Sequence, residues 1–233
     1  KMNGSITIAA GATFKSDSAD ITGKFFGGTG TLTLNEAFAG LDQVDVDIIN
    51  FAKSGADLPA KTFVAKSKAV IAEDLNINAG KLDSKLANGD LMSDNIHGDG
   101  TLKLEKAIDL SKVGVTKLGA LELTGKNTYK LGSKQDITKT TLGIDSILEV
   151  TANSELTGDL ETGKSTITLG TNSLTAKSLT LTDDITVKTT LASATSYGKI
   201  IAPTTGGGKK VNLDITSGTT FASGVEFEIL SSL

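Results

Sequence analysis

The chain of 233 residues has no cysteine, tryptophan or arginine, only two prolines, and only 4% aromatic residues. Without cysteine it has no disulfide, thiolate nucleophile or cysteine-based metal site. The shortage of aromatic side chains argues against a core built on aromatic anchors, so small and β-branched residues must fill the interior. No apolar run approaches the roughly 20 residues that a membrane-spanning helix needs.

All 23 basic residues are lysine, and none is arginine. The bidentate guanidinium fork that clamps phosphate or reads guanine is therefore missing. The formal net charge is −4, so we expect no nucleic-acid partner.

What the sequence has in abundance is strict alternation of apolar and polar residues over short segments. This pattern predicts half-buried strands with one apolar face. The segments run from one end of the chain to the other: 6–8, 31–34, 44–48, 75–78, 101–104, 121–123, 148–150, 166–169, 179–181, 211–215 and 225–229. Helical periodicity is weak, and the candidates 35–39, 50–54 and 104–118 are equally compatible with protruding loops.

Glycine-containing segments separate these strands, as at Gly27-Gly28, Gly98-Asp99-Gly100 and Gly206-Gly207-Gly208, and we expect turns there. Gly28-Thr29-Gly30-Thr31-Leu32-Thr33-Leu34 returns as Gly98-Asp99-Gly100-Thr101-Leu102-Lys103-Leu104, with a degraded copy from Gly119 to Leu123. Irregularly spaced repeats of turn and strand predict an all-β right-handed parallel β-helix, a solenoid of roughly 20 residues per coil with a few loop or short helical insertions.

We expect residues 1–233 to form a single β-helical domain. Residues 50–118 are less regular, with more lysine, alanine and loop. Residues 197–233 are expected to form stable carboxy-terminal coils, with the alternating apolar side chains of 211–215 and 225–229 buried and Phe221 and Phe227 as large fillers. Because the start lacks the basic and then apolar pattern of a signal peptide, we expect a fragment of a longer protein.

One segment carries a more specific pattern, Gly119-Ala120-Leu121-Glu122-Leu123-Thr124-Gly125-Lys126-Asn127-Thr128-Tyr129. It resembles the passenger-associated transport repeat of bacterial autotransporters, G-x-L-x-L-x-G-x-N-T-Y. The stretch from Tyr197 to Leu230 is similar to the last passenger coils of rickettsial surface cell antigens. The resemblance implies type V secretion, a β-helical passenger exported through the outer membrane to the bacterial surface, and adhesion to host cells as a virulence function.

Candidate chemical sites are few, and each has a structural explanation that we favour. His97, with Asp94 or Asp99, could form an acid-base or metal site, but a polar turn is the better interpretation. Asp45 and Asp47, with Asp42 nearby, could act as a carboxylate pair, as could Glu226 and Glu228, but a solvated outer strand face explains both pairs.

Two glycine-rich segments approach known ligand loops without completing them. The segment from Gly27 to Asn35 is close to a calcium-binding nonapeptide, but Leu32 stands where the aspartate ligand belongs. The segment from Pro203 to Lys210 is close to a phosphate loop, but Pro203 replaces its first glycine and Lys210 replaces the Ser/Thr that would meet Mg²⁺. We therefore expect no catalytic, cofactor-binding or metal-binding residues and no cofactor.

The sequence thus predicts a non-enzymatic, secreted cell-surface protein, acting as an adhesin or as a stalk that presents one. Its expected partners are a host-cell surface protein or glycan and the membrane barrel of its own parent chain, and the fragment itself is expected to be monomeric. A structural surface-layer protein is the closest alternative. A β-helical polysaccharide-degrading enzyme is a more distant one, because sugar-binding clefts typically stack rings on aromatic side chains, of which this chain has few.

Overall fold

The structure is a computed structural model that describes residues 5–16, 25–34, 43–51, 62–65, 70–77, 81–84, 91–206, 208–221 and 223–232. Its contacts divide the chain into two compact units, residues 1–108 with 113–122 and residues 109–112 with 123–233. Such a division does not test whether the chain is one domain, because each coil of a solenoid contacts only its neighbours.

Unit 1 is built from parallel strands in the order β1-β3-β4-β6-β8-β9, with β2 paired to β3 and β5 paired to β7. Its strands are β1 (Ser5–Thr7), β2 (Thr13–Ser16), β3 (Phe25–Leu34), β4 (Gln43–Phe51), β5 (Thr62–Ala65), β6 (Val70–Ile77), β7 (Lys81–Ser84), β8 (Leu91–Leu104) and β9 (Gly114–Leu123).

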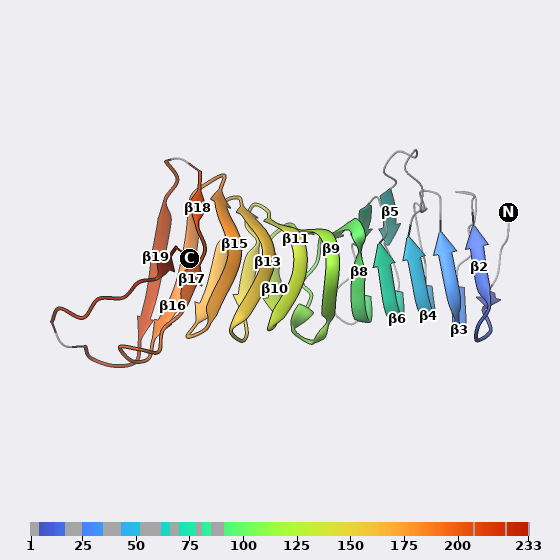
Figure 1. The fold of residues 1–233 in the computed structure, drawn as a ribbon, viewed down its shortest axis with the longest axis horizontal. Coiled ribbons are helices and arrows are strands. Elements are labelled where there is room, and N and C mark those ends of the chain that lie inside the picture. Colours follow the sequence, from blue (N-terminus) through green and yellow to red (C-terminus); the bar gives the residue numbers. More distant parts are fainter. Residues whose placement is uncertain are drawn as a thin grey trace. The chain divides into compact units, whose positions relative to one another are not determined.

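Unit 2 contains two rows of parallel strands, β11-β13-β15-β17-β20 and β10-β12-β14-β16-β19 (Figure 1). Its elements are the 3₁₀ turn η1 (Leu110–Lys112) and the strands β10 (Thr128–Leu131), β11 (Lys134–Leu142), β12 (Ile147–Val150), β13 (Ser154–Thr162), β14 (Thr166–Gly170), β15 (Ser173–Leu181), β16 (Ile185–Leu191), β17 (Lys199–Ile201), β18 (Thr204–Thr205), β19 (Val211–Ser217) and β20 (Leu230–Ser231).

The strand register of unit 2 fixes the length of its coils. Thr128 pairs with Ile147, and Ile147 pairs in turn with Thr166, so these two coils advance by equal steps along the chain. The step matches the coil length expected for such a solenoid. The last coil is longer, because Ile185 pairs with the more distant Val211. The predicted parallel β-solenoid is confirmed, and the described residues contain no α-helix.

The core consists of apolar columns that the strand register stacks above one another. In unit 2 one column runs through Tyr129, Leu148, Ile167 and Val187, and each of these side chains is at most 1% exposed. This arrangement explains the alternation in the sequence, since every second residue of each strand joins a column while its neighbours face outward.

The repeated glycines lie inside long strands, and the expected turns at Gly27-Gly28 and Gly98-Asp99-Gly100 are wrong. A Cβ built on Gly28 would lie 2.2 Å from the carbonyl oxygen of Ile8, and one on Gly98 would lie 2.3 Å from that of Ile77. Glycine is therefore needed where a strand bends against the backbone of the preceding coil.

Of the two alternatives left open for segment 104–118, the helix is wrong: η1 is its only helical turn, and β9 begins at Gly114. The expected strand at 225–229 is also wrong, and Val225 is 37% exposed. The helix candidate 35–39 lies outside the described residues. Of the candidate 50–54, residues 50–51 end β4, and residues 52–54 lie outside the described residues.

The carboxy-terminal segment also differs from expectation in its burial. Leu213 and Ile215 of β19 are 49% and 48% exposed, because β19 is the last strand of its row and no described strand covers it. Phe227 is only half-buried, against Phe221 and Tyr197, with ring centroids 4.9 and 5.2 Å away.

Candidate functional site

His97 lies in the middle of β8, paired with Asn76 of β6, so the expected polar turn is wrong. The imidazole is half-buried, whereas Asp94 and Asp99 are exposed. Over the described part of the chain, no cluster of three or more His, Cys, Asp or Glu side chains could hold a metal ion.

Asp45 and Asp47 both belong to β4, while Asp42 lies outside the described residues. The alternation over 44–48 predicts that Ile48 faces the core. In the structure Ile48 is 36% exposed, and its neighbour Ile49 is fully buried instead. The pairing of β3 with β4 is irregular next to this point, because three residue steps from Gly28 to Thr31 face two from Val46 to Ile48. Glu226 and Glu228 are exposed, as expected, but outside any strand.

The two incomplete ligand loops have structural roles. Leu32, which stands at the aspartate position of the nonapeptide pattern, is fully buried in the core of unit 1. Gly206 and Gly208 adopt positive φ angles of 118° and 71°, as turn residues do, while Gly207 lies outside the described residues. The backbone N–H of Lys210 donates to Asp184 Oδ1 at 2.8 Å, which fixes the end of this turn.

The segment that carries the resemblance builds a tight turn before β10. The Tyr129 hydroxyl donates to the carbonyl of Thr124 at 2.6 Å, and the Asn127 side-chain amide donates to the same oxygen at 3.2 Å. Gly125 supplies the positive φ of 78° that the turn needs. Asparagine, tyrosine and glycine at these positions therefore satisfy the local backbone and fill the core, and their roles here are structural.

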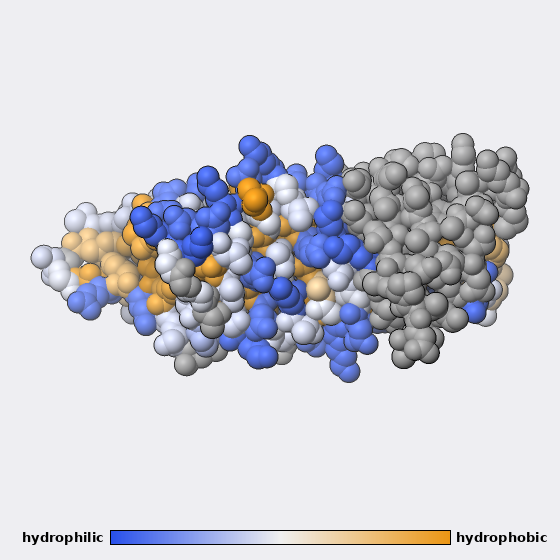
Figure 2. Space-filling view, turned by 90° about the horizontal axis from the view of Figure 1, so that it is seen from above, coloured by the Kyte–Doolittle hydropathy of each residue, from blue (hydrophilic) through white to orange (hydrophobic). Residues whose placement is uncertain are grey.

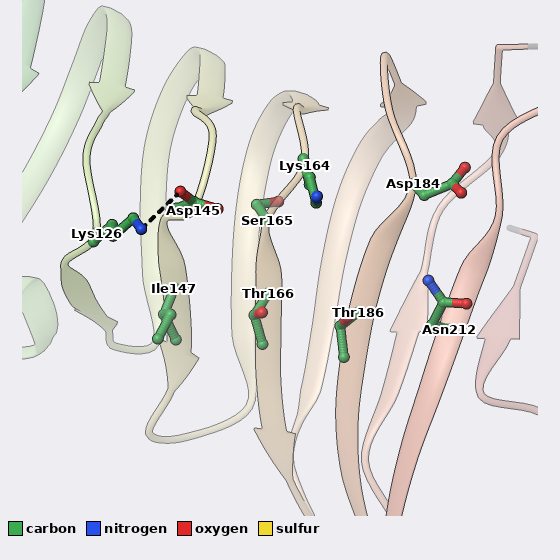
Figure 3. A pocket seen from close by; sticks show the side chains of 9 residues that line it. All are labelled: Lys126, Asp145, Ile147, Lys164, Ser165, Thr166, Asp184, Thr186 and Asn212. Atoms are coloured by element: carbon green, nitrogen blue, oxygen red, sulfur yellow. Dashed lines mark ion pairs between the residues drawn. The ribbon is translucent and has the colours of Figure 1, made fainter.

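A groove of about 530 Å³ lies on the outer face of β12, β14, β16 and β19 in unit 2 (Figure 3). Its floor is a single outward column, in which the register places Ile147 beside Thr166, Thr166 beside Thr186 and Thr186 beside Asn212. The volume lies within the range of about 300 to 1,000 Å³ that is usual for small-molecule sites.

The rim of the groove carries charges of alternating sign, which come from the turns before β10, β12, β14 and β16. These residues are Lys126, Asp145, Lys164 and Asp184, and the last three each stand two positions before the floor residue of the following strand. Lys126 Nζ lies 3.6 Å from Asp145 Oδ2, as Figure 3 shows. Neighbouring strands are about 4.8 Å apart, so the alternation places unlike charges next to one another along the stack and avoids repulsion.

Ser165 is the one polar group lining the groove whose burial is not matched by a hydrogen bond within the described part of the chain. The residue is 6% exposed, and its Oγ has no hydrogen-bond partner among the described residues. Ser146 holds the same place one coil earlier, and its Oγ donates to the carbonyls of Leu123 and Gly125 at 3.1 and 3.0 Å. A buried hydroxyl without a partner is unfavourable, so Ser165 is a locally unsatisfied position of the coil beneath the groove.

No family model, curated protein or solved structure matches this chain. The resemblance to autotransporter passengers therefore stays a prediction. Within the described residues, no helix has the length and apolar character needed to cross a membrane.

The groove was missed by sequence reasoning, although one signal for it was present. Lys126, Asp145 and Lys164 follow one another at the coil spacing that the strand register shows. The sign alternation is visible only once that spacing is known, because the coil length varies along the chain. The unpaired state of Ser165 depends on its surroundings in three dimensions and leaves no trace in the sequence.

Proposed function

We propose that this chain is a non-enzymatic binding solenoid displayed on a bacterial surface, a passenger fragment of a type V secreted protein. It serves as an adhesin or as the stalk that presents one, and its partner is a host-cell surface protein or glycan. The parallel solenoid fold and the turn built by Asn127, Thr128 and Tyr129 are compatible with this proposal.

The observation that carries the proposal is the outer face of the row β10-β12-β14-β16-β19. Backbone pairing holds its outward side chains at fixed spacing over five successive strands. A rigid array of this kind loses little conformational freedom on binding, which favours recognition by surface complementarity. The groove lined by Thr166 and Thr186 lies on this face.

The proposal is tested by measuring the binding of fluorescently labelled chain to cultured animal cells by flow cytometry. An adhesin gives saturable binding that unlabelled chain displaces. Binding that never saturates, or none at all, would contradict the adhesive function.

A structural surface-layer role is the second candidate, and a specific observation favours it. Leu213 and Ile215 are about half exposed on β19, the last strand of its row, which leaves an apolar strand edge open to another chain. Figure 2 shows apolar surface at the carboxy-terminal end of unit 2. Sedimentation velocity separates the two functions, because a layer protein forms large assemblies as its concentration rises and an adhesin fragment stays monomeric.

A polysaccharide-degrading enzyme is the third and least favoured candidate. Incubation with polysaccharides and an assay for newly released reducing ends tests it directly. The parent sequence tests the secretion class, since a type V protein carries a signal peptide before the passenger and a membrane barrel after it.

A further inference from the structure

We propose that β19 pairs with β19 of a second copy of this chain, antiparallel and about a two-fold axis that passes through Leu213. The inference goes beyond the proposed function, because it concerns the last strand of a row and not the recognition of a host partner. Two observations carry it: the uncovered edge of β19, and the match of this strand to itself in one register.

The apolar side chains of β19 continue the core of unit 2 without being covered. The register places Leu213 beside Val187, which is 1% exposed, so Leu213 extends a core column by one strand. Leu213 itself is 49% exposed, and Ile215 is 48% exposed. They remain this open in the presence of the described part of the connection to β20, residues 218–221 and 223–229. Another strand beside β19 would remove this apolar surface from water.

The backbone groups of the same apolar residues face the open edge. The N–H of Ile185 donates to the carbonyl of Lys210 at 2.9 Å, so every second residue from Lys210 onward points its backbone groups toward β16. The N–H and C=O groups of Val211, Leu213 and Ile215 therefore point to the opposite side, where no described strand pairs with β19. Such an edge is a template for a strand of another chain.

The sequence of β19 is complementary to itself when the two-fold axis passes through Leu213. In that register Leu213 lies opposite Leu213 of the second copy, and Val211 lies opposite Ile215. Apolar side chains then meet on the inward face, where both cores are open. On the outward face Asn212 lies opposite Asp214, so its amide can donate to the carboxylate.

The neighbouring antiparallel registers are less favourable. An axis through Asp214 sets two carboxylates directly opposite each other, which is destabilising. An axis through Asn212 sets the apolar Ile215 opposite Lys209. An axis between two residues joins the inward face of one strand to the outward face of the other. The axis through Leu213 is the one register that gives all three apolar residues of β19 apolar partners.

This contact is closed, because both copies use the same edge and no second edge of β19 remains. The dimer therefore stops at two chains and differs from the large assemblies of a layer protein. A single pair of short strands lies at the low end of interface sizes, so the dimer is weak. The expected monomer is the state of the dilute chain, including the concentrations of a cell-binding assay.

Single-cysteine variants test the register directly, since the chain has no cysteine of its own. The two Leu213 Cα atoms would be about 5.5 Å apart in a hydrogen-bonded pair, within the range of about 4.4 to 6.8 Å that a disulfide needs. Mild oxidation of concentrated Leu213→Cys is expected to give a covalent dimer at least about tenfold faster than Asp214→Cys, whose sulfurs are displaced along the strands. Ile144→Cys, at a 67% exposed position away from β19, is the second control.

Sedimentation velocity from about 1 µM to about 1 mM tests the dimer without cysteine, and wild type is expected to pass from one chain to two. Leu213→Lys sets two ammonium groups opposite each other and should stay monomeric. Ile144→Lys, the matched change elsewhere, should dimerise as wild type does. Circular dichroism verifies that each variant keeps its β signal.

The inference is overturned if wild type stays monomeric over this range, if it grows beyond two chains, or if Asp214→Cys or Ile144→Cys crosslinks as fast as Leu213→Cys. A monomer would show that the edge is covered by the chain's own connection to β20 or stays open. Growth would show a head-to-tail contact. None of these outcomes bears on adhesion, because cell binding is measured on the dilute monomer.

Discussion

At some positions of this solenoid, the backbone of the preceding coil leaves no space for a side chain, and only glycine fits. Gly158 of β13 illustrates this, because a Cβ there would lie 2.1 Å from the carbonyl oxygen of Thr138. Gly119 faces the carbonyl oxygen of Asp99 in the same way, at 2.0 Å. The glycine recurrence in the sequence therefore marks strand bends at which two coils approach too closely for a side chain.

Replacement of Gly158 by alanine tests this explanation. We expect Gly158→Ala to lower the free energy of unfolding by about 1 to 3 kcal/mol, because the backbone must move to admit the methyl group. Gly218→Ala is the matched control, since nothing lies within 4 Å of its Cβ position, and it should have almost no effect. Urea unfolding measures both variants, and equal stability of the two would contradict the explanation.

Asp109 is the residue at which pH dependence is expected. Hydrogen bonding from the Ser111 hydroxyl lowers the pKa of the Asp109 carboxyl below 3.8, with help from the Ser111 backbone N–H, Lys130 and Lys112 and against the effect of burial. A folded-state pKa below the unfolded value stabilises the fold above the unfolded pKa, and this contribution is lost as pH falls through the folded pKa.

We therefore expect Asp109→Asn to be less stable than wild type at pH 7, with the difference shrinking as the pH falls below about 4. Urea unfolding at pH 7, 4 and 2 measures the difference. A gap between wild type and variant that is as large at pH 2 as at pH 7 would show that the carboxylate charge is not its cause.

At the scale of the elements, the sequence was informative about strands and much less so about their burial. Alternation predicted the strands around Leu148, Ile167 and Leu179 correctly, because each places one residue in two into a column. It failed at Ile48, which lies beside an irregularity in the pairing of β3 with β4, and at Leu213, which lies on a strand that no described strand covers. An irregular strand pairing or the end of a row does not alter the alternation of apolar and polar residues. The exposure of these side chains therefore could not be predicted from the sequence.

The same limit applies to the candidate site. Its residue types were visible, but their convergence depends on the strand register, which pairs them across coils of unequal length. The resemblance at Asn127, Thr128 and Tyr129 pointed to a turn and not to the groove.

Two apolar substitutions on strands of the same row test the column model. Ile167→Ala, in a fully buried position of β14, should cost about 2 to 5 kcal/mol. Leu213→Ala, in a position of β19 that is 49% exposed, should cost much less. Denaturant unfolding compares them, and a larger loss for Leu213→Ala would restore the carboxy-terminal coils as the most stable part of the chain.

At the scale of the whole molecule, the proposed binding function involves one outer face of unit 2. The face is made of outward side chains that take no part in the core, so it can be altered while the fold is kept. Thr186 faces outward from β16 in the groove, and Thr175 faces outward from β15 in the other row. Both are half-buried threonines in their strands, which makes them a matched pair.

The decisive experiment is therefore the saturable binding of labelled chain to cultured cells for wild type, Thr186→Lys and Thr175→Lys, with circular dichroism to confirm that all three keep their β signal. We expect Thr186→Lys to abolish cell binding, because a long charged side chain fills the neutral groove, while Thr175→Lys binds as wild type does. Wild-type binding by Thr186→Lys, or loss of binding by Thr175→Lys alone, would contradict the assignment of function to this face.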